Sequence, residues 1–204
     1  MFNESKNPSF ITKIADLLGL NLLFILTCIP LITIGASLAA MYHVTLKMAD
    51  EDRDYYVIKD YLKSFKQNFL QGSIAFAFVI TLGIALFYFM MFMNQDGPPT
   101  PVVAFVLLVA LTLIILTSIY IFPLIAYYEN NIIDTFKHAL IMTFHQMAKS
   151  ILMFIIPLIL IAILPLIDMR LAFMWFILSF SLTAYLQSLL LIRIFKSYHK
   201  GEKK

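Results

Sequence analysis

Four long stretches of this sequence contain no Asp, Glu, Lys, Arg or His, and they constrain the fold more than any other feature. They are residues 72–92, 102–128, 151–167 and 171–192. A helix needs about 20 apolar residues to cross about 30 Å of hydrocarbon. Backbone groups in lipid must be satisfied within a helix or a closed barrel, and the alternating pattern of a barrel strand is missing. The sequence therefore predicts membrane-spanning helices and an all-α fold.

The overall composition also favours lipid as the solvent. Hydrophobic residues make up 61% of the 204 residues and charged residues 13%, against about 45–50% and about 25% in soluble domains. A single soluble core cannot bury that much apolar surface, so we expect residues 1–204 to form one integral membrane domain, a polytopic transmembrane helical bundle.

The first apolar region, residues 14–48, is too long for one comfortable span and is broken near its middle. Pro30 lacks a backbone donor, Gly35 loosens the helix, and Thr33 has a hydroxyl that can bond a freed carbonyl. One interpretation is a single span near 17–34 that continues into a loop. The other is a hairpin of two short helices, 14–29 and 36–48, with a re-entrant turn shaped by Pro30, Thr33 and Gly35. The chain has five membrane segments with a single span in this region and six with a hairpin.

The positions of Lys and Arg help to distinguish these two topologies. The hairpin places 14 of the 15 basic residues on one side of the membrane, whereas a single span places 12 there. Because basic loops stay in the cytoplasm, both topologies put the 49–71 loop and the C-terminus inside. The hairpin has the cleaner asymmetry and also puts the N-terminus inside, so we favour it. Anionic lipid explains the basic tail after residue 192 without a nucleic-acid partner.

Two cytoplasmic segments are amphipathic, and each leads into a span. In 57–70 the apolar positions at helical spacing are Val57, Ile58, Tyr61, Leu62, Phe65 and Phe69. Residues 132–147 show the same pattern, with Asn131 placed to cap the helix. We expect both helices to lie at the membrane interface before the chain turns in. Asn68, at the entry of the span 72–92, is expected to satisfy backbone groups there.

The spans contain little chemistry that points to catalysis. Ionisable groups inside a membrane usually mark ion paths or proton relays, and the four long stretches have only tyrosines. The sequence has no nucleophile elbow, phosphate-binding loop, dinucleotide fingerprint or zinc-protease motif. We therefore expect no enzyme, no cofactor and no metal site. Hydroxyls in 102–128 and 171–192 either line a solute path or bond between helices, and we prefer the second explanation.

Short motifs along nearly the whole chain resemble the YesL-like family of bacterial integral membrane proteins. The first set is Asn21-Leu22-Leu23-Phe24, Pro30-Leu31-Ile32-Thr33-Ile34-Gly35-Ala36 and Ala39-Ala40-Met41-Tyr42, followed by the basic Lys47. The second set is the Phe-rich basic stretch 60–71, with Phe65, Lys66, Asn68 and Phe69, and the segment 123–139, with Glu129 and Asn130.

The resemblance implies a cellular context but no chemical activity. Members of the family have no established activity and tend to be encoded beside sugar-utilisation systems, often with ABC sugar importers. For this chain, the resemblance implies a non-enzymatic accessory or interaction component of carbohydrate uptake in a bacterial cell membrane. Its partners would be the lipid bilayer and an ABC sugar importer or another membrane protein. The alternative is a facilitator or permease for a neutral small solute, since broken helices often form substrate sites.

Overall fold

The computed structural model describes residues 10–50, 54–93, 100–128, 131–163 and 172–201, and the regular elements within them are helices. The first part contains α1 (Phe10–Thr27), the 3-10 turn η1 (Leu31–Thr33) and α2 (Ile34–Ala49). The middle part contains α3 (Val57–Gln67), α4 (Phe69–Met93) and α5 (Pro101–Tyr127). The last part contains α6 (Ile132–His145), α7 (Met147–Pro157), the π-helix η2 (Leu158–Ile163) and α9 (Ala172–Gly201). The expected all-α fold is confirmed.

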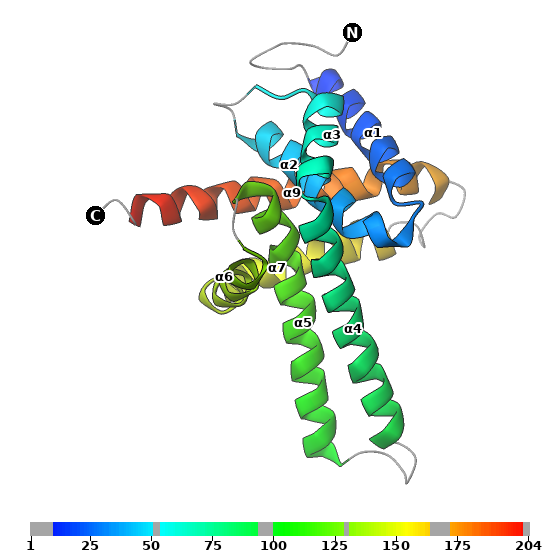
Figure 1. The fold of residues 1–204 in the computed structure, drawn as a ribbon, viewed down its shortest axis with the longest axis vertical. Coiled ribbons are helices and arrows are strands. Elements are labelled where there is room, and N and C mark those ends of the chain that lie inside the picture. Colours follow the sequence, from blue (N-terminus) through cyan, green and yellow to red (C-terminus); the bar gives the residue numbers. More distant parts are fainter. Residues whose placement is uncertain (1–9, 51–53, 94–99, 129–130, 164–171, 202–204) are drawn as a thin grey trace.

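The helices form two distinct regions (Figure 1). α4 and α5 make a long hairpin that projects downwards in this view from a cluster of the other helices. Within the cluster, α2 packs against α3, α4, α5 and α9, so it is the central helix. α9 runs across the upper part of the hairpin instead of alongside it. The apolar helices therefore do not all run in one direction.

Among the residues that the structure describes, four helices are long and apolar enough to cross a membrane, which indicates a multi-pass membrane protein. They are Leu31–Ala49, Phe69–Met93, Pro101–Tyr127 and Leu178–Phe195. A fifth candidate is the pair Ile132–His145 and Met147–Ile161, which is bent by 101° at the break between its two parts. α1 is a further apolar helix, with Lys13 and Asp16 in its first two turns.

The first apolar region forms two helices separated by a break. α1 ends at Thr27, and α2 begins at Ile34 after the η1 turn. Pro30 has extended backbone angles, with φ −76° and ψ 119°, so the helix cannot continue through it. In Figure 1, α2 turns back from the end of α1. These are the two helices that the hairpin interpretation requires.

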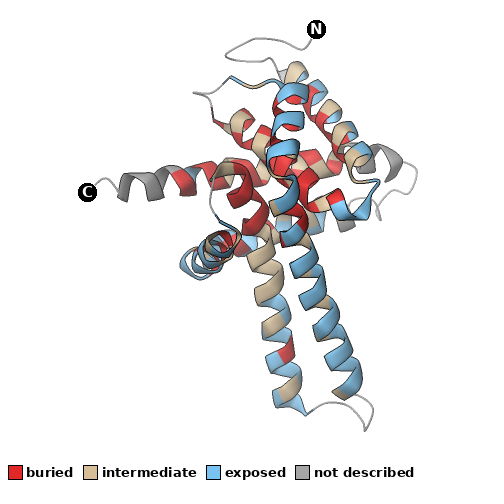
Figure 2. Cartoon of the chain, in the orientation of Figure 1, coloured by how far each residue is buried: buried red, intermediate tan, exposed pale blue. Residues whose placement is uncertain are grey.

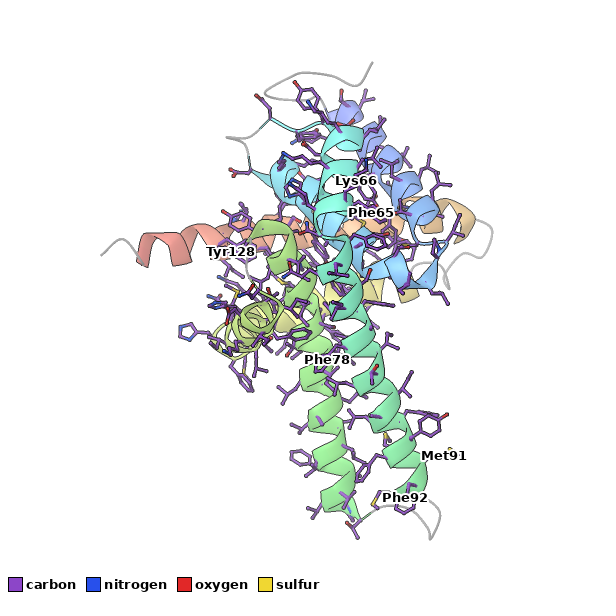
Figure 3. The ribbon with its side chains drawn as sticks, viewed as in Figure 1. Phe65, Lys66, Phe78, Met91, Phe92 and Tyr128 are labelled. Carbon is purple, nitrogen blue, oxygen red and sulfur yellow. The ribbon has the colours of Figure 1, made fainter. Side chains whose placement is uncertain are left out.

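The two regions differ in how much of their apolar surface the chain itself covers (Figure 2). In the most apolar 18-residue windows of α4 and α5, only 6% of the residues are buried, against 67% for Leu31–Ala49 and 56% for Leu178–Phe195. Figure 3 places Met91 and Phe92 at the far end of the hairpin, where their side chains are 61% and 63% exposed. With 25 residues, α4 is about 37 Å long, enough to span the hydrocarbon of a bilayer. Lipid is the environment that suits such a surface.

α3 buries one part of its apolar face and exposes the other. Its buried residues are Val57, Asp60, Tyr61 and Ser64. The apolar residues Ile58 and Leu62 are 49% and 42% exposed. Asp60 lies on the buried side, where it forms an ion pair with Lys47 on α2. An apolar strip of α3 therefore remains on the surface.

The second amphipathic helix, α6, begins at Ile132 as the sequence predicts and ends at His145, and α7 is less regular than expected. Asn131 stands at the N-cap of α6, where its carbonyl accepts a bond from the Thr135 N–H at 2.9 Å without a side-chain cap bond. α7 changes into the π-helix η2 directly after Pro157, because proline lacks the donor that an α-helix needs. The predicted turn at 168–170 and the end of the span 151–167 lie outside the described residues.

Candidate functional site

A group of buried hydrogen bonds joins α2 to α9. Tyr42 donates its phenol hydrogen to Oε1 of Gln187, and Nε2 of Gln187 donates to the Met153 carbonyl on α7 at 2.8 Å. Further along the same two helices, the hydroxyls of Thr45 and Ser188 are 2.8 Å apart. We call Tyr42, Thr45, Gln187 and Ser188 the polar seam. All four are buried, so their hydrogen bonds hold three helices in one register.

Small side chains on α2 allow these helices to approach closely. The first two turns of α2 contain the buried residues Gly35, Ala36, Ser37, Ala39 and Ala40. Small residues at helix contacts in membranes let backbones come together and make van der Waals packing effective. The run of small residues in the sequence thus accounts for the central position of α2.

The closest helix approach in this region is between Gly35 and Gly72. A Cβ atom built on Gly35 would lie 2.0 Å from the Gly72 carbonyl oxygen and 2.7 Å from Cβ of Phe76. A Cβ built on Gly72 would lie 2.8 Å from the backbone of Ala36. Neither backbone can shift easily, so both positions require glycine. Gly35, which the sequence singled out for a turn, therefore stands at the contact between the starts of α2 and α4.

The Thr33 hydroxyl lies close to carbonyl groups at the end of α1 and within the break. Its Oγ1 atom lies 2.5 Å from the Thr27 carbonyl and 2.6 Å from the Pro30 carbonyl. The expected hydrogen bond to a carbonyl left free by the break is confirmed. Ser37, one turn into α2, donates to the Thr33 carbonyl at 2.9 Å. These local hydrogen bonds satisfy carbonyl groups that the break between α1 and α2 leaves outside a regular helix.

Asn68 lies between α3 and α4, as the sequence predicts. Its N–H donates to the Ser64 carbonyl at 2.9 Å, and its carbonyl accepts from the Gly72 N–H at 2.8 Å. Its side chain donates to the Ser64 hydroxyl at 3.1 Å. Figure 3 shows the neighbouring Phe65 and Lys66 at this end of α3. The backbone of Asn68 therefore continues the helical hydrogen-bond pattern from α3 into α4.

The C-terminal half of α2 carries charged and ionisable groups. Nζ of Lys47 lies 3.0 Å from Oδ1 of Asp60, while Oδ2 of Asp60 accepts from the Tyr56 N–H at 2.8 Å. Nδ1 of His43 lies 3.1 Å from the Ala126 carbonyl on α5, so this ring nitrogen is the donor. A cavity of about 50 Å³ lies beside His43, Lys47 and Ala126. It has room for small molecules such as water and is too small for a sugar.

Two tyrosines connect α1 to α3 and the loop before it. The Tyr61 hydroxyl is 2.5 Å from Oγ1 of Thr27, and the Tyr55 hydroxyl donates to Oδ2 of Asp16 at 2.9 Å. Burial raises the pKa of Tyr61 to about 12. Burial, together with the hydrogen bond to Asp16, also raises the pKa of Tyr55 above its usual value. Both phenols therefore stay neutral at physiological pH, and Tyr55 keeps the proton that it donates to Asp16.

Some hydroxyls of the two hydroxyl-rich spans bond to other helices, while the buried hydroxyls of Thr117 and Thr183 have no hydrogen-bond partner in the described part of the chain. On α9, Gln187 and Ser188 bond to α2 and α7. On α5, Tyr120 meets the Ser150 hydroxyl of α7 at 2.9 Å, and Ser118 bonds back to its own helix. These contacts correspond to the packing explanation of the hydroxyls. Among the residues that the structure describes, no group of three His, Cys, Asp or Glu side chains comes together as metal ligands do.

Several residues of this region were not singled out from the sequence. Gly72 could have been recognised from the sequence, because it lies near the start of an apolar helix, as Gly35 does. Asp16 could have been recognised as a carboxylate inside an apolar helix, because ionisable residues in membrane helices usually mark functional sites. The pairing of Tyr42 with Gln187 links positions 145 residues apart, and no local pattern predicts it.

Comparison with known proteins gives a family without an assigned function. Residues 17–90 match the model of a family described as "Protein of unknown function, DUF624". The matched segment covers the polar and small-residue part of α2, the Gly35–Gly72 contact and Asn68. No curated protein and no solved structure matches the chain.

Proposed function

We propose that this protein is a non-enzymatic component of a bacterial cell membrane that binds a transporter of a carbohydrate-uptake system. The α4–α5 hairpin is the surface that makes the contact. The polar seam and the glycine contact hold the other helices as a scaffold behind it. The N-terminus, the 49–71 loop and the C-terminus face the cytoplasm in this arrangement, because it leaves nearly all basic residues on that side.

The observation that carries the proposal is the uncovered surface of the hairpin. Phe87 on α4 and Phe105 on α5 are 66% and 65% exposed, although both belong to helices of spanning length. Large aromatic side chains on a two-helix hairpin offer broad van der Waals contact to the helices of another membrane protein. The rest of the chain covers mainly the ends of α4 and α5 that join the cluster (Figure 2).

The link to carbohydrate rests on resemblance. The motifs around Pro30, Gly35, Lys47 and Asn68 resemble those of the YesL-like family, whose members tend to be encoded beside sugar-utilisation systems with ABC importers. We therefore take the membrane subunits of such an importer as the expected partner.

Site-specific photo-crosslinking in the native membrane tests this proposal. A photoreactive residue is placed at Phe105 on the hairpin and, in a matched variant, at the exposed Ile133 on α6. Cells are grown with and without an inducing polysaccharide, irradiated, and the crosslinked proteins are identified by mass spectrometry. We expect a transporter subunit to be captured from position 105 under induction, and not from position 133.

Two results would count against the proposal. Capture of lipid alone from position 105 would mean that the hairpin has no protein partner. Sugar uptake by vesicles that contain the purified protein and no other component would favour the facilitator alternative.

A further inference from the structure

A groove of about 180 Å³ lies on the outer side of the helix cluster, between α1 and α3. Its walls are formed by Leu22 and Leu26 of α1 and by Val57 and Ile58 of α3. Leu22, Leu26 and Ile58 are 53%, 62% and 49% exposed, so the groove is open along one side. It is separate from the polar seam and from the α4–α5 hairpin.

The lining of the groove is apolar except for Asp16 at one end. Asp16 is only 5% exposed and accepts the hydrogen bond from Tyr55. One to three turns further along α1, the lining consists of Leu22 and Leu26. This polarity matches a molecule with a charged head and an apolar tail.

The floor of the groove is open because residue 19 is glycine. A Cβ built on Gly19 meets no other atom within 4 Å. Glycine is unfavourable inside a helix by about 1 kcal/mol relative to alanine, and packing does not require it here. A larger side chain would project into the groove without displacing the fold.

We propose that this groove binds a bilayer phospholipid with a primary ammonium headgroup, placing the ammonium at Asp16 and an acyl chain along Leu22 and Leu26. A carboxylate buried beside apolar walls is stabilised by a cation that also donates hydrogen bonds. A primary ammonium supplies three donors, whereas the quaternary ammonium of choline supplies none. This inference is independent of the proposed partner of the hairpin.

The test is lipid binding by the full chain, purified in mild detergent and titrated in native mass spectrometry. The probes are phosphatidylethanolamine, phosphatidylcholine and phosphatidylglycerol with identical acyl chains. We expect phosphatidylethanolamine to bind about tenfold more tightly than phosphatidylcholine, the size of one charge-assisted hydrogen bond. Asp16→Asn should abolish this preference while lipid still binds. Gly19→Leu should remove the binding of all three lipids to this site.

Matched variants separate a filled groove from a damaged fold. Gly83 on α4 also has no atom within 4 Å of a built Cβ, so Gly83→Leu makes the same change far from the groove and should leave the preference intact. If Gly19→Leu does not fold, as judged by circular dichroism, Ile58→Trp closes the mouth instead. Ile133→Trp, at the equivalent second position of α6, is its control.

Equal affinity for the three lipids would overturn the proposal. So would a preference for phosphatidylethanolamine that Asp16→Asn leaves unchanged, or one that Gly19→Leu and Ile58→Trp leave unchanged.

Discussion

The α2–α9 contact and the α4–α5 hairpin handle their polar side chains in opposite ways. In the polar seam, Gln187 and Thr45 bond to side chains of other helices. On the hairpin, Thr81 bonds to the Ala77 carbonyl and Thr112 to the Leu108 carbonyl, each at 2.8 Å and four residues back in its own helix. The polar seam joins helices through its side chains, whereas these two hairpin hydroxyls bond only within their own helices. Hairpin residues that bond to other helices, such as Tyr120 to Ser150, lie near the end that joins the cluster.

Whether a polar side chain bonds to its own helix or to another one distinguishes faces that can be exposed to lipid from faces that must pack against a helix. A hydroxyl that bonds back to its own helix needs nothing from outside, so the residue can face hydrocarbon. A glutamine or tyrosine cannot do this and requires a neighbouring helix. Hydropathy alone would rank the most apolar helices as the core. Here the most apolar helices are the least covered, and the moderately apolar ones are buried.

The largest expected effect is at the glycine contact. Gly35→Leu places a side chain where even a Cβ lies 2.0 Å from the Gly72 carbonyl, so α2 and α4 must separate. We expect a loss of about 3 kcal/mol in the free energy of unfolding and reduced accumulation in the membrane. Unfolding in detergent by a denaturing surfactant, followed by circular dichroism, measures the change. Gly83→Leu on the hairpin is the control, and equal losses in both variants would break the contrast between the regions.

The second effect is at the ion pair between α2 and α3. Asp60→Ala removes both the partner of Lys47 and the acceptor of the Tyr56 N–H, and leaves a partly buried ammonium. We expect a cost of about 2 kcal/mol in the same unfolding assay. The double variant K47M/D60L, which removes both charges, should recover most of this loss. If the double variant is as unstable as Asp60→Ala, the loss in the free energy of unfolding does not come from the unpaired charge of Lys47.

The third effect concerns the polar seam. Tyr42→Phe and Gln187→Leu each remove one partner of the same hydrogen bond. A double-mutant cycle should therefore give a coupling energy of about 1 kcal/mol, near the upper range for hydrogen bonds between membrane helices. A coupling energy near zero would mean that this contact does not stabilise the α2–α9 packing.

The smallest effect is expected on the hairpin. Thr81→Val and Thr112→Val keep the side-chain shape and remove hydroxyls that bond only to their own helix. We expect each to change the free energy of unfolding by no more than about 0.5 kcal/mol. A loss as large as that at the polar seam would show that these hydroxyls have partners on another helix of the chain.

Most helices could be predicted from the sequence, because the absence of charge over spanning lengths is a local property. The break at Pro30 and the bond of Thr33 were also predictable, since both follow from the chemistry of proline and of a nearby hydroxyl. Which part of the apolar face of α3 is buried was not predictable, because it depends on the neighbouring helices, such as α2, whose Lys47 pairs with Asp60. Contacts such as Tyr42 with Gln187 depend on which helices meet, and hydropathy gives no information on that.

The position of α2 has a consequence for biosynthesis. Its glycine contact with α4 forms between residues 37 positions apart, early during synthesis, whereas the partners of Tyr42 and Thr45 are 145 and 143 residues downstream. At about 5–20 residues per second, the ribosome supplies α9 several seconds after α2. During that interval, the Tyr42 phenol lacks its Gln187 acceptor, whereas the Thr45 hydroxyl can bond to carbonyls of its own helix. The packing of α2 against α9 can therefore form only after nearly the whole chain has been synthesised.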